Sequence, residues 1–119
     1  MNIIMKKDVV VGLGEIGSPL LKLFSKNEKV VGYDIDKKLM NMKKYDKFID
    51  LPTLFLHIAI PVTKKFDFNI IQSYKKFQPE CIVIHSTIPP GTTEKIQKKL
   101  TCPLIYSATR GVHKRMLKD

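Results

Sequence analysis

The feature that most constrains this chain is a glycine-rich turn between a run of valines and an apolar helix pattern. Gly12, Gly14 and Gly17 have the spacing G-x-G-x-x-G and follow directly after Val9-Val10-Val11. Glycines at this spacing after a strand are typical of a phosphate-binding turn that opens a βα unit. The first glycine permits the tight turn, the second lets a ligand approach the backbone, and the third lets the helix lie against the strand.

The backbone of this turn is the first candidate binding site. The N–H groups at the start of a helix have no partner within the helix, and the positive end of the helix dipole lies there. A pyrophosphate is therefore expected to lie against this segment. The segment comprises Gly12, Leu13, Gly14, Glu15, Ile16 and Gly17. The Glu15 carboxylate would repel a pyrophosphate, so its side chain is expected to point to solvent.

A carboxylate ends the next apolar run. Residues 29–33 predict a second strand, and Asp34 follows 22 residues after Gly12. An acid at about 20 residues from the glycines typically accepts hydrogen bonds from the hydroxyls of the adenosine ribose. Its charge would repel a 2′-phosphate, which favours NAD over NADP. The alternative is that the glycines form an ordinary βα turn and that Asp34 only caps the next helix.

Strand and helix patterns alternate along the whole chain. Strands are predicted at residues 3–11, 29–33, 48–49, 54–60, 81–85 and 103–106. Helices are predicted at residues 15–26, 36–44, 66–77, 92–100 and 113–118. This alternation predicts an α/β fold of the Rossmann type, a doubly wound, mainly parallel six-stranded sheet with helices on both faces. A length of 119 residues fits one such domain, residues 1–119.

Ligands of such sheets bind beyond the carboxyl ends of the strands. The segments expected to converge there are residues 12–17, Asp34 and the loops 60–62, 85–91 and 107–111. His85 lies at a strand end, where a packed, hydrogen-bonded histidine is favoured over a role in proton transfer. His57 lies in the middle of a predicted strand and is interpreted as a core residue.

Composition argues against several classes of partner. The formal net charge is +10, but the lysines occur in scattered pairs without an arginine-rich stripe, so a solvated surface that favours anionic ligands is expected rather than a nucleic-acid interface. No run approaches the roughly 20 apolar residues of a membrane span, and no signal peptide is visible, so a cytoplasmic protein without a membrane partner is expected. Cys81 and Cys102 form no metal-ligand pattern, so no metal site is predicted, and both are expected to be buried, reduced thiols.

Four longer segments resemble one protein family. They are residues 11–20 (VGLGEIGSPL), 31–36 (VGYDID), 60–62 (IPV) and, with the greatest specificity, 86–94 (STIPPGTTE). Over residues 1–107 the chain resembles the N-terminal NAD-binding domain of the UDP-glucose/GDP-mannose 6-dehydrogenase family, within the group related to 6-phosphogluconate dehydrogenase. The resemblance implies NAD as cofactor, with Asp34 on the adenosine ribose. It also implies that Ile60, Pro61, Ser86 and Thr87 flank the ribose and nicotinamide end.

The chain departs from that family in two respects. Family members are several times longer and draw their catalytic cysteine and much of the sugar-nucleotide site from later domains, which this sequence does not contain. The catalytic glutamate of the family's Ser-Pro-Glu motif corresponds to Thr109 here, and a threonine cannot act as a carboxylate base. No catalytic residue is therefore assigned. Thr87 is a candidate to orient substrate or water, with capping of the turn as the alternative.

Two functions of different class remain open at this stage. One is an NAD(H)-binding domain of an oxidoreductase that is inactive alone and works with a substrate domain or with a second copy in a homodimer. The other is a non-catalytic module that senses NAD(H) or another adenine nucleotide. Arg110, His113 and Arg115 form a basic cluster that suits either a substrate phosphate or carboxylate, or a solvated face or partner contact.

Overall fold

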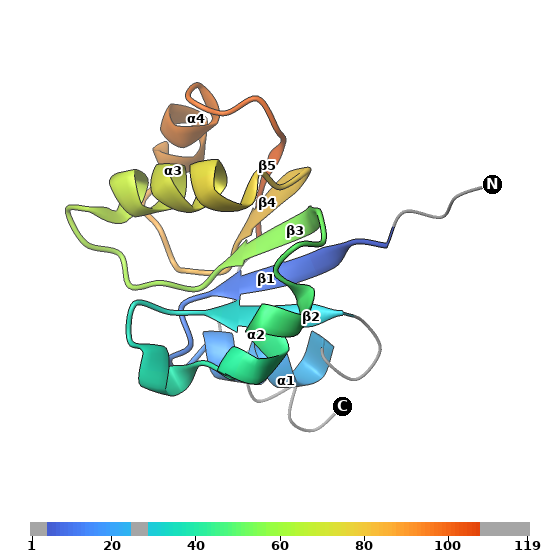
Figure 1. Ribbon diagram of the computed structural model, residues 1–119. Coiled ribbons are helices and arrows are strands. Elements are labelled where there is room, and N and C mark those ends of the chain that lie inside the picture. Colours follow the sequence, from blue (N-terminus) through green and yellow to red (C-terminus); the bar gives the residue numbers. More distant parts are fainter. Residues whose placement is uncertain (1–4, 25–28, 108–119) are drawn as a thin grey trace.

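The computed structural model describes residues 5–24 and 29–107 of the chain. Its centre is an all-parallel sheet in the order β2-β1-β3-β4-β5 (Figure 1). The strands are β1 (Lys7–Val11), β2 (Val30–Tyr33), β3 (Thr53–Ile58), β4 (Cys81–Ile84) and β5 (Leu104–Tyr106). The helices are α1 (Gly17–Phe24), α2 (Met42–Phe48), α3 (Phe66–Phe77), α4 (Thr92–Gln97) and a short 3₁₀ turn, η1 (Lys37–Leu39).

Apolar side chains pack on both faces of the sheet. On one face, buried residues of the strands join α2, α3 and α4 in one cluster that includes Val9, Tyr45, Leu56, Ile70, Ile84 and Ile96. On the other face, Val10 and Val30 pack with Leu13 and Leu20 from the region of α1. The α/β class, with helices on both sides of a parallel sheet, is therefore confirmed and is consistent with a Rossmann-like fold.

The order of the strands reverses next to β1. The chain passes from β1 to β2 on one side and then crosses to β3 on the other side of β1. In open α/β sheets, ligands bind beyond the carboxyl ends of the strands at such a switch point. A ligand is therefore expected to bind at the carboxyl ends of β1, β2 and β3.

Among the described residues the sheet has five strands rather than the six predicted, because residues 48–49 do not form a strand. Phe48 is the last residue of α2, and Ile49 is its C-cap in helical conformation (φ −58°, ψ −32°). The helix begins after Asn41, whose side chain accepts a hydrogen bond from the backbone N–H of Lys44 at 3.1 Å. Within α2, Tyr45 and Phe48 are one turn apart and both pack into the core. These two apolar residues therefore follow helical spacing.

The single helix predicted over residues 36–44 is also wrong. Asp36 caps the short turn η1, because its side chain accepts a hydrogen bond from Lys38 N at 3.1 Å. Met40 is then extended, with φ −94° and ψ 146°, and ends that turn before α2 begins. The segment is thus a 3₁₀ turn followed by a separate helix.

The helix predicted at residues 66–77 is confirmed with the same bounds, whereas the bounds of the other predicted elements differ by a few residues. In the described residues the first strand covers 7–11, the first helix 17–24 and the fourth helix 92–97. Part of the first predicted strand (3–4) and the predicted helix 113–118 lie outside the described residues. Cys102 is buried as expected, but Cys81 is only half-buried, and burial raises the pKa of both thiols. In the described part of the chain, no helix has the length and apolar character needed to cross a bilayer.

One buried lysine joins β1 to the segment that follows α2. Lys7 is 3% exposed, and its ammonium donates hydrogen bonds to the backbone carbonyls of Ile49 and Leu51. Burial lowers the pKa of Lys7, and the nearby Asp50 carboxylate opposes that shift. The Lys7 side chain therefore satisfies the carbonyl of the C-cap residue of α2 and one carbonyl of the segment that follows it.

Candidate functional site

The glycine turn lies at the carboxyl end of β1, and its three glycines have different roles. Gly12 has φ +93°, in the left-handed region that favours glycine, and a Cβ there would lie 2.8 Å from the carbonyl oxygen of Ala59. A Cβ on Gly17 would lie 1.5 Å from the carbonyl oxygen of Gly12, so α1 can lie this close only with glycine. A Cβ on Gly14 would meet no atom within 4 Å. The space beside Gly14 is therefore open to a ligand.

The backbone donors of this turn fall into two groups. Gly12 N donates to the carbonyl of Tyr33 at 2.9 Å, and Leu13 N donates to Asp34 Oδ2 at 2.8 Å. The next three N–H groups, at residues 14–16, have no acceptor among the described residues. They come just before the first residue of α1, where the helix dipole is positive. This segment can therefore donate hydrogen bonds to an anion.

The Asp34 carboxylate is fixed across the turn. Its Oδ2 accepts from Leu13 N, and its Oδ1 accepts from Asp36 N at 2.8 Å. Each carboxylate oxygen retains a second lone pair for a ligand hydroxyl. The alternative role as a helix cap is taken by Asp36, which is the N-cap of η1. Asp34 instead connects the end of β2 to the glycine turn.

The loops after β3 and β4 are tied together. Ser86 Oγ donates to the carbonyl oxygen of Ile60 at 2.5 Å, and His85 N donates to the carbonyl oxygen of Ile58 at 2.8 Å. Ser86 is 5% exposed, whereas Thr87 is exposed. Ser86 therefore has a structural hydrogen bond of its own, and the Thr87 hydroxyl is the more accessible of the two.

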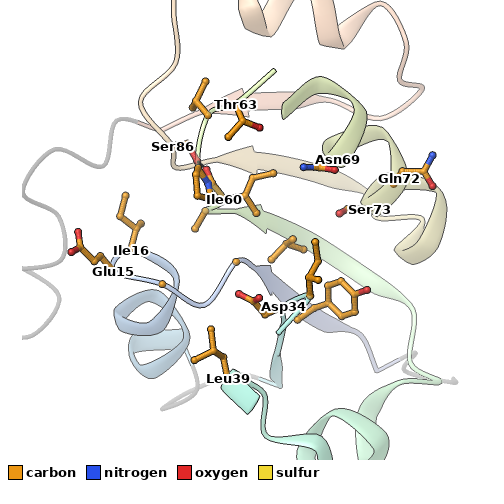
Figure 2. Close-up of a pocket in the computed structure, with 18 of the residues that line it drawn as sticks. Glu15, Ile16, Asp34, Leu39, Ile60, Thr63, Asn69, Gln72, Ser73 and Ser86 are labelled. Atoms are coloured by element: carbon orange, nitrogen blue, oxygen red, sulfur yellow. Dashed lines mark hydrogen bonds between the residues drawn. The ribbon is translucent and has the colours of Figure 1, made fainter. Parts of the chain in front are cut away.

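One cavity of about 1160 Å³ connects these features (Figure 2). It exceeds the range of about 300–1,000 Å³ that is usual for small-molecule sites. The sequence-predicted residues that line it are Gly12, Gly14, Glu15, Ile16, Asp34, Ile60, Pro61, Ser86 and Thr87. The glycine turn, Asp34 and two of the three predicted loops thus share one crevice.

Two predicted binding residues do not line the cavity. The Leu13 side chain is 3% exposed and packs in the core beside α1, so only its backbone faces the site, through the bond to Asp34. Gly17 is buried against Gly12. Ser107 also does not line the cavity. Thr109, Arg110, His113 and Arg115 lie outside the described residues.

The sequence interpretation missed one wall of the cavity, which α3 provides. Asn69, Gln72, Ser73 and Lys76 all line the cavity from this helix. They recur at intervals of three and four residues, a spacing visible in the sequence, whereas the prediction of this helix rests on its apolar residues alone. Other unpredicted lining residues are Tyr33, Ile35, Leu39 and Thr63, whereas Val62 belongs to the predicted loop 60–62.

The charged side chains on the cavity wall are few. Among the described lining residues they are Glu15, Asp34 and Lys76. Glu15 is exposed, and in Figure 2 its carboxylate points away from Asp34 and Ile60, as expected for an acid beside an anion site. Lys76 Nζ lies 5.3 Å from the centre of the Tyr33 ring. The Lys76 ammonium is therefore the positively charged group among the described lining residues, and it lies beside Tyr33, the residue that precedes Asp34.

His57 and His85 form a buried pair outside this cavity. Nδ1 of His57 lies 2.9 Å from Nε2 of His85, so one ring donates and the other accepts. Burial lowers the pKa of each to about 4, and for His57 the adjacent His85 adds to the shift. The interpretation of both as packed, hydrogen-bonded residues is confirmed.

Comparisons with protein-family models, with curated proteins and with solved structures found no match to this chain. The likeness to the nucleotide-sugar dehydrogenase family therefore rests on the sequence segments alone.

Proposed function

We propose that this chain is an NAD(H)-binding domain of the oxidoreductase type, similar to the N-terminal part of UDP-glucose and GDP-mannose 6-dehydrogenases, and that it is inactive alone. One observation carries the proposal. A single cavity combines three N–H groups at residues 14–16 that have no acceptor in the described part of the chain, the fixed carboxylate of Asp34 and the paired loops after β3 and β4.

The residues of the cavity fit a dinucleotide part by part. The N–H groups at residues 14–16 suit the diphosphate, and the open space at Gly14 allows its close approach. Asp34 suits the adenosine ribose diol, and its negative charge favours NAD over NADP. The loops with Ile60 and Thr87 then hold the nicotinamide end. The nicotinamide ring exchanges a hydride when it is bound, and this chain binds and orients it.

Catalysis needs a group that the described part of the cavity does not supply. The loops after β3 and β4 contribute the hydroxyls of Thr63, Ser86 and Thr87, but no carboxylate or imidazole from the described residues. A hydroxyl of ordinary pKa is a poor general base at neutral pH. The base is therefore expected from a substrate domain or a second chain.

The same observation favours a second candidate function. A module that senses NAD(H) needs the binding groups and no base. Both candidates predict that the chain alone produces no NADH from NAD⁺ and UDP-glucose. Steady NADH production would therefore contradict both. Recovery of turnover on addition of a separate substrate domain would favour the first.

The binding proposal is tested by calorimetric titration of the chain with NADH and NADPH. The wild type is expected to bind NADH more tightly than NADPH. Asp34→Asn is expected to weaken NADH binding by about tenfold, because the ribose loses a charged acceptor. The preference over NADPH should shrink at the same time. Unchanged affinities in the folded variant would show that Asp34 does not contact the ribose.

A steric variant tests the diphosphate site independently. Gly14→Val places side-chain atoms in space that is open in this structure, so it is expected to fold and to lose NADH binding. Thr93→Val introduces a similar side chain in α4, outside the residues that line the cavity, and should bind NADH as the wild type does. No heat with NADH at millimolar concentration in the folded wild type would overturn the proposed function.

A further inference from the structure

One face of α3 forms a second polar wall of the cavity, separate from the glycine turn and Asp34. The proposed contacts to the diphosphate and the ribose do not involve this wall. Its members recur at intervals that place them on one side of a helix. They are Asn69, Gln72, Ser73 and Lys76. The buried residues Phe66, Ile70 and Phe77 pack this helix onto the sheet. The polar wall is therefore held in place by the core.

The neutral polar side chains of this wall are not engaged by other described residues of the chain. The side chains of Asn69, Gln72 and Ser73 make no hydrogen bond with any described residue. Ser73 is only 8% exposed, so its hydroxyl has limited access to water. Figure 2 shows Asn69 and Ser73 extending from α3 on the side of the cavity where Ile60 and Asp34 lie. These groups are available to a ligand in the cavity.

The position of this wall relative to Asp34 identifies the part of a ligand that it can reach. The rings of Tyr33 and Phe77 are 5.4 Å apart, so α3 contacts the residue that precedes Asp34. A ribose whose diol lies on Asp34 and whose phosphate lies on residues 14–16 carries its base on the remaining side. Ile35, which directly follows Asp34, and Leu39 also line the cavity and are 89% and 51% exposed. They leave an apolar surface for the face of a flat ring.

We propose that Asn69, Gln72 and Ser73 hydrogen-bond the edge of the heterocyclic base and that this wall selects adenine over a 6-oxopurine. The inference rests on the proposed function. A carboxamide presents one donor and one acceptor together, which matches the N6 amino group and N7 of adenine. A 6-oxopurine presents two acceptors, O6 and N7, at the same edge. One carboxamide cannot satisfy both acceptors.

Lys76 is not part of the base-reading set. Its ammonium lies over two aromatic rings, 5.3 Å from the centre of Tyr33 and 5.8 Å from that of Phe77. Lys75 is adjacent in sequence but lines a different, smaller cavity with Tyr74 and Gln78. Substitution of Lys75 therefore provides a matched control on the same helix.

The test compares NADH with reduced nicotinamide hypoxanthine dinucleotide, two ligands that differ only in the base. Calorimetric titration of the wild type is expected to give a preference for NADH of about tenfold. Asn69→Ala/Gln72→Ala should bring the ratio of the two affinities close to one, mainly by weakening NADH. Lys75→Ala should leave the ratio unchanged.

A conservative variant keeps the test independent of folding. Gln72→Glu keeps the size of an exposed side chain but replaces the amide donor with an acceptor. It should weaken the binding of both dinucleotides and retain the preference for NADH, because a carboxylate still accepts from N6 but repels O6 and N7. Equal affinities in the wild type, an unchanged ratio in Asn69→Ala/Gln72→Ala, or unchanged affinities in Gln72→Glu would overturn the proposal and leave NAD(H) binding intact. Failure of the wild type to bind either dinucleotide would overturn the proposed function as well.

Discussion

At the scale of single residues, two glycines of one motif have opposite tolerance to a side chain. A Cβ on Gly17 would lie 1.5 Å from a carbonyl oxygen of the turn, whereas a Cβ on Gly14 would meet nothing within 4 Å. Gly17→Ala is therefore expected to lower the free energy of unfolding by about 3 kcal/mol or more. Gly14→Ala should change it by less than about 1 kcal/mol.

Urea denaturation of the two variants beside the wild type measures this difference. Both replacements introduce the same methyl group, so each serves as the control for the other. Equal midpoints for Gly17→Ala and the wild type would mean that α1 does not approach the turn as closely as this structure has it. Of the two positions, only Gly14, which tolerates a side chain, can be substituted to test ligand binding without disturbing the fold.

At the scale of elements, α2 depends on its cap. The helix has seven residues, and the Asn41 side chain satisfies one of its first N–H groups, that of Lys44. Asn41→Ala is expected to reduce the free energy of unfolding by about 1 kcal/mol, because that N–H loses its acceptor. Lys43→Ala, an exposed change in the same helix, should stay within about 0.5 kcal/mol of the wild type. Indistinguishable denaturation curves for Asn41→Ala and Lys43→Ala would contradict the assigned cap.

The fold of this region shows where sequence patterns reach their limit. Phe48 and Ile49 are two adjacent apolar residues, too few to distinguish a strand from the end of a helix. The observed helix is favoured by the cap at Asn41, which is local, and by the bond from Lys7 to the carbonyl of Ile49, which spans 42 residues of sequence. The cap at Asn41 could have been predicted from the sequence because it is local, whereas the bond from Lys7 depends on the tertiary fold.

The candidate site divides in the same way. The glycine turn and Asp34 could be predicted because their spacing along one βαβ unit fixes them near each other. The polar face of α3 could not, because a polar helix face ordinarily faces solvent. Only the packing of Phe66, Ile70 and Phe77 determines that this face borders a cavity.

At the scale of the whole molecule, the buried histidine pair makes folding depend on pH. In the unfolded chain both imidazoles have a pKa near 6.5, whereas burial lowers the pKa of each to about 4 in the fold. Between these values the unfolded chain binds protons that the folded chain does not. Stability is therefore complete above pH 6.5 and falls as the pH drops toward 4, by at most about 1.4 kcal/mol per pH unit for each imidazole.

Urea midpoints measured between pH 7 and pH 4.5 check this dependence. His85→Gln removes one titrating ring and offers His57 an amide partner, so its midpoint should change less steeply over the same interval. Carboxylates affect both proteins alike, so the difference between the two slopes reports the histidine. Parallel slopes for the variant and the wild type would show that the pair does not resist protonation.

The hydrogen bond from Ser86 to the carbonyl of Ile60 joins residues 26 positions apart in the chain. It makes the rim of the crevice on that side one connected edge, because neither loop can move outward at this point without breaking a partly buried bond. The entropic cost of ordering both loops is thus incurred when the chain folds rather than when a ligand binds. A preorganised edge of this kind increases the affinity for a ligand without adding any contact to it.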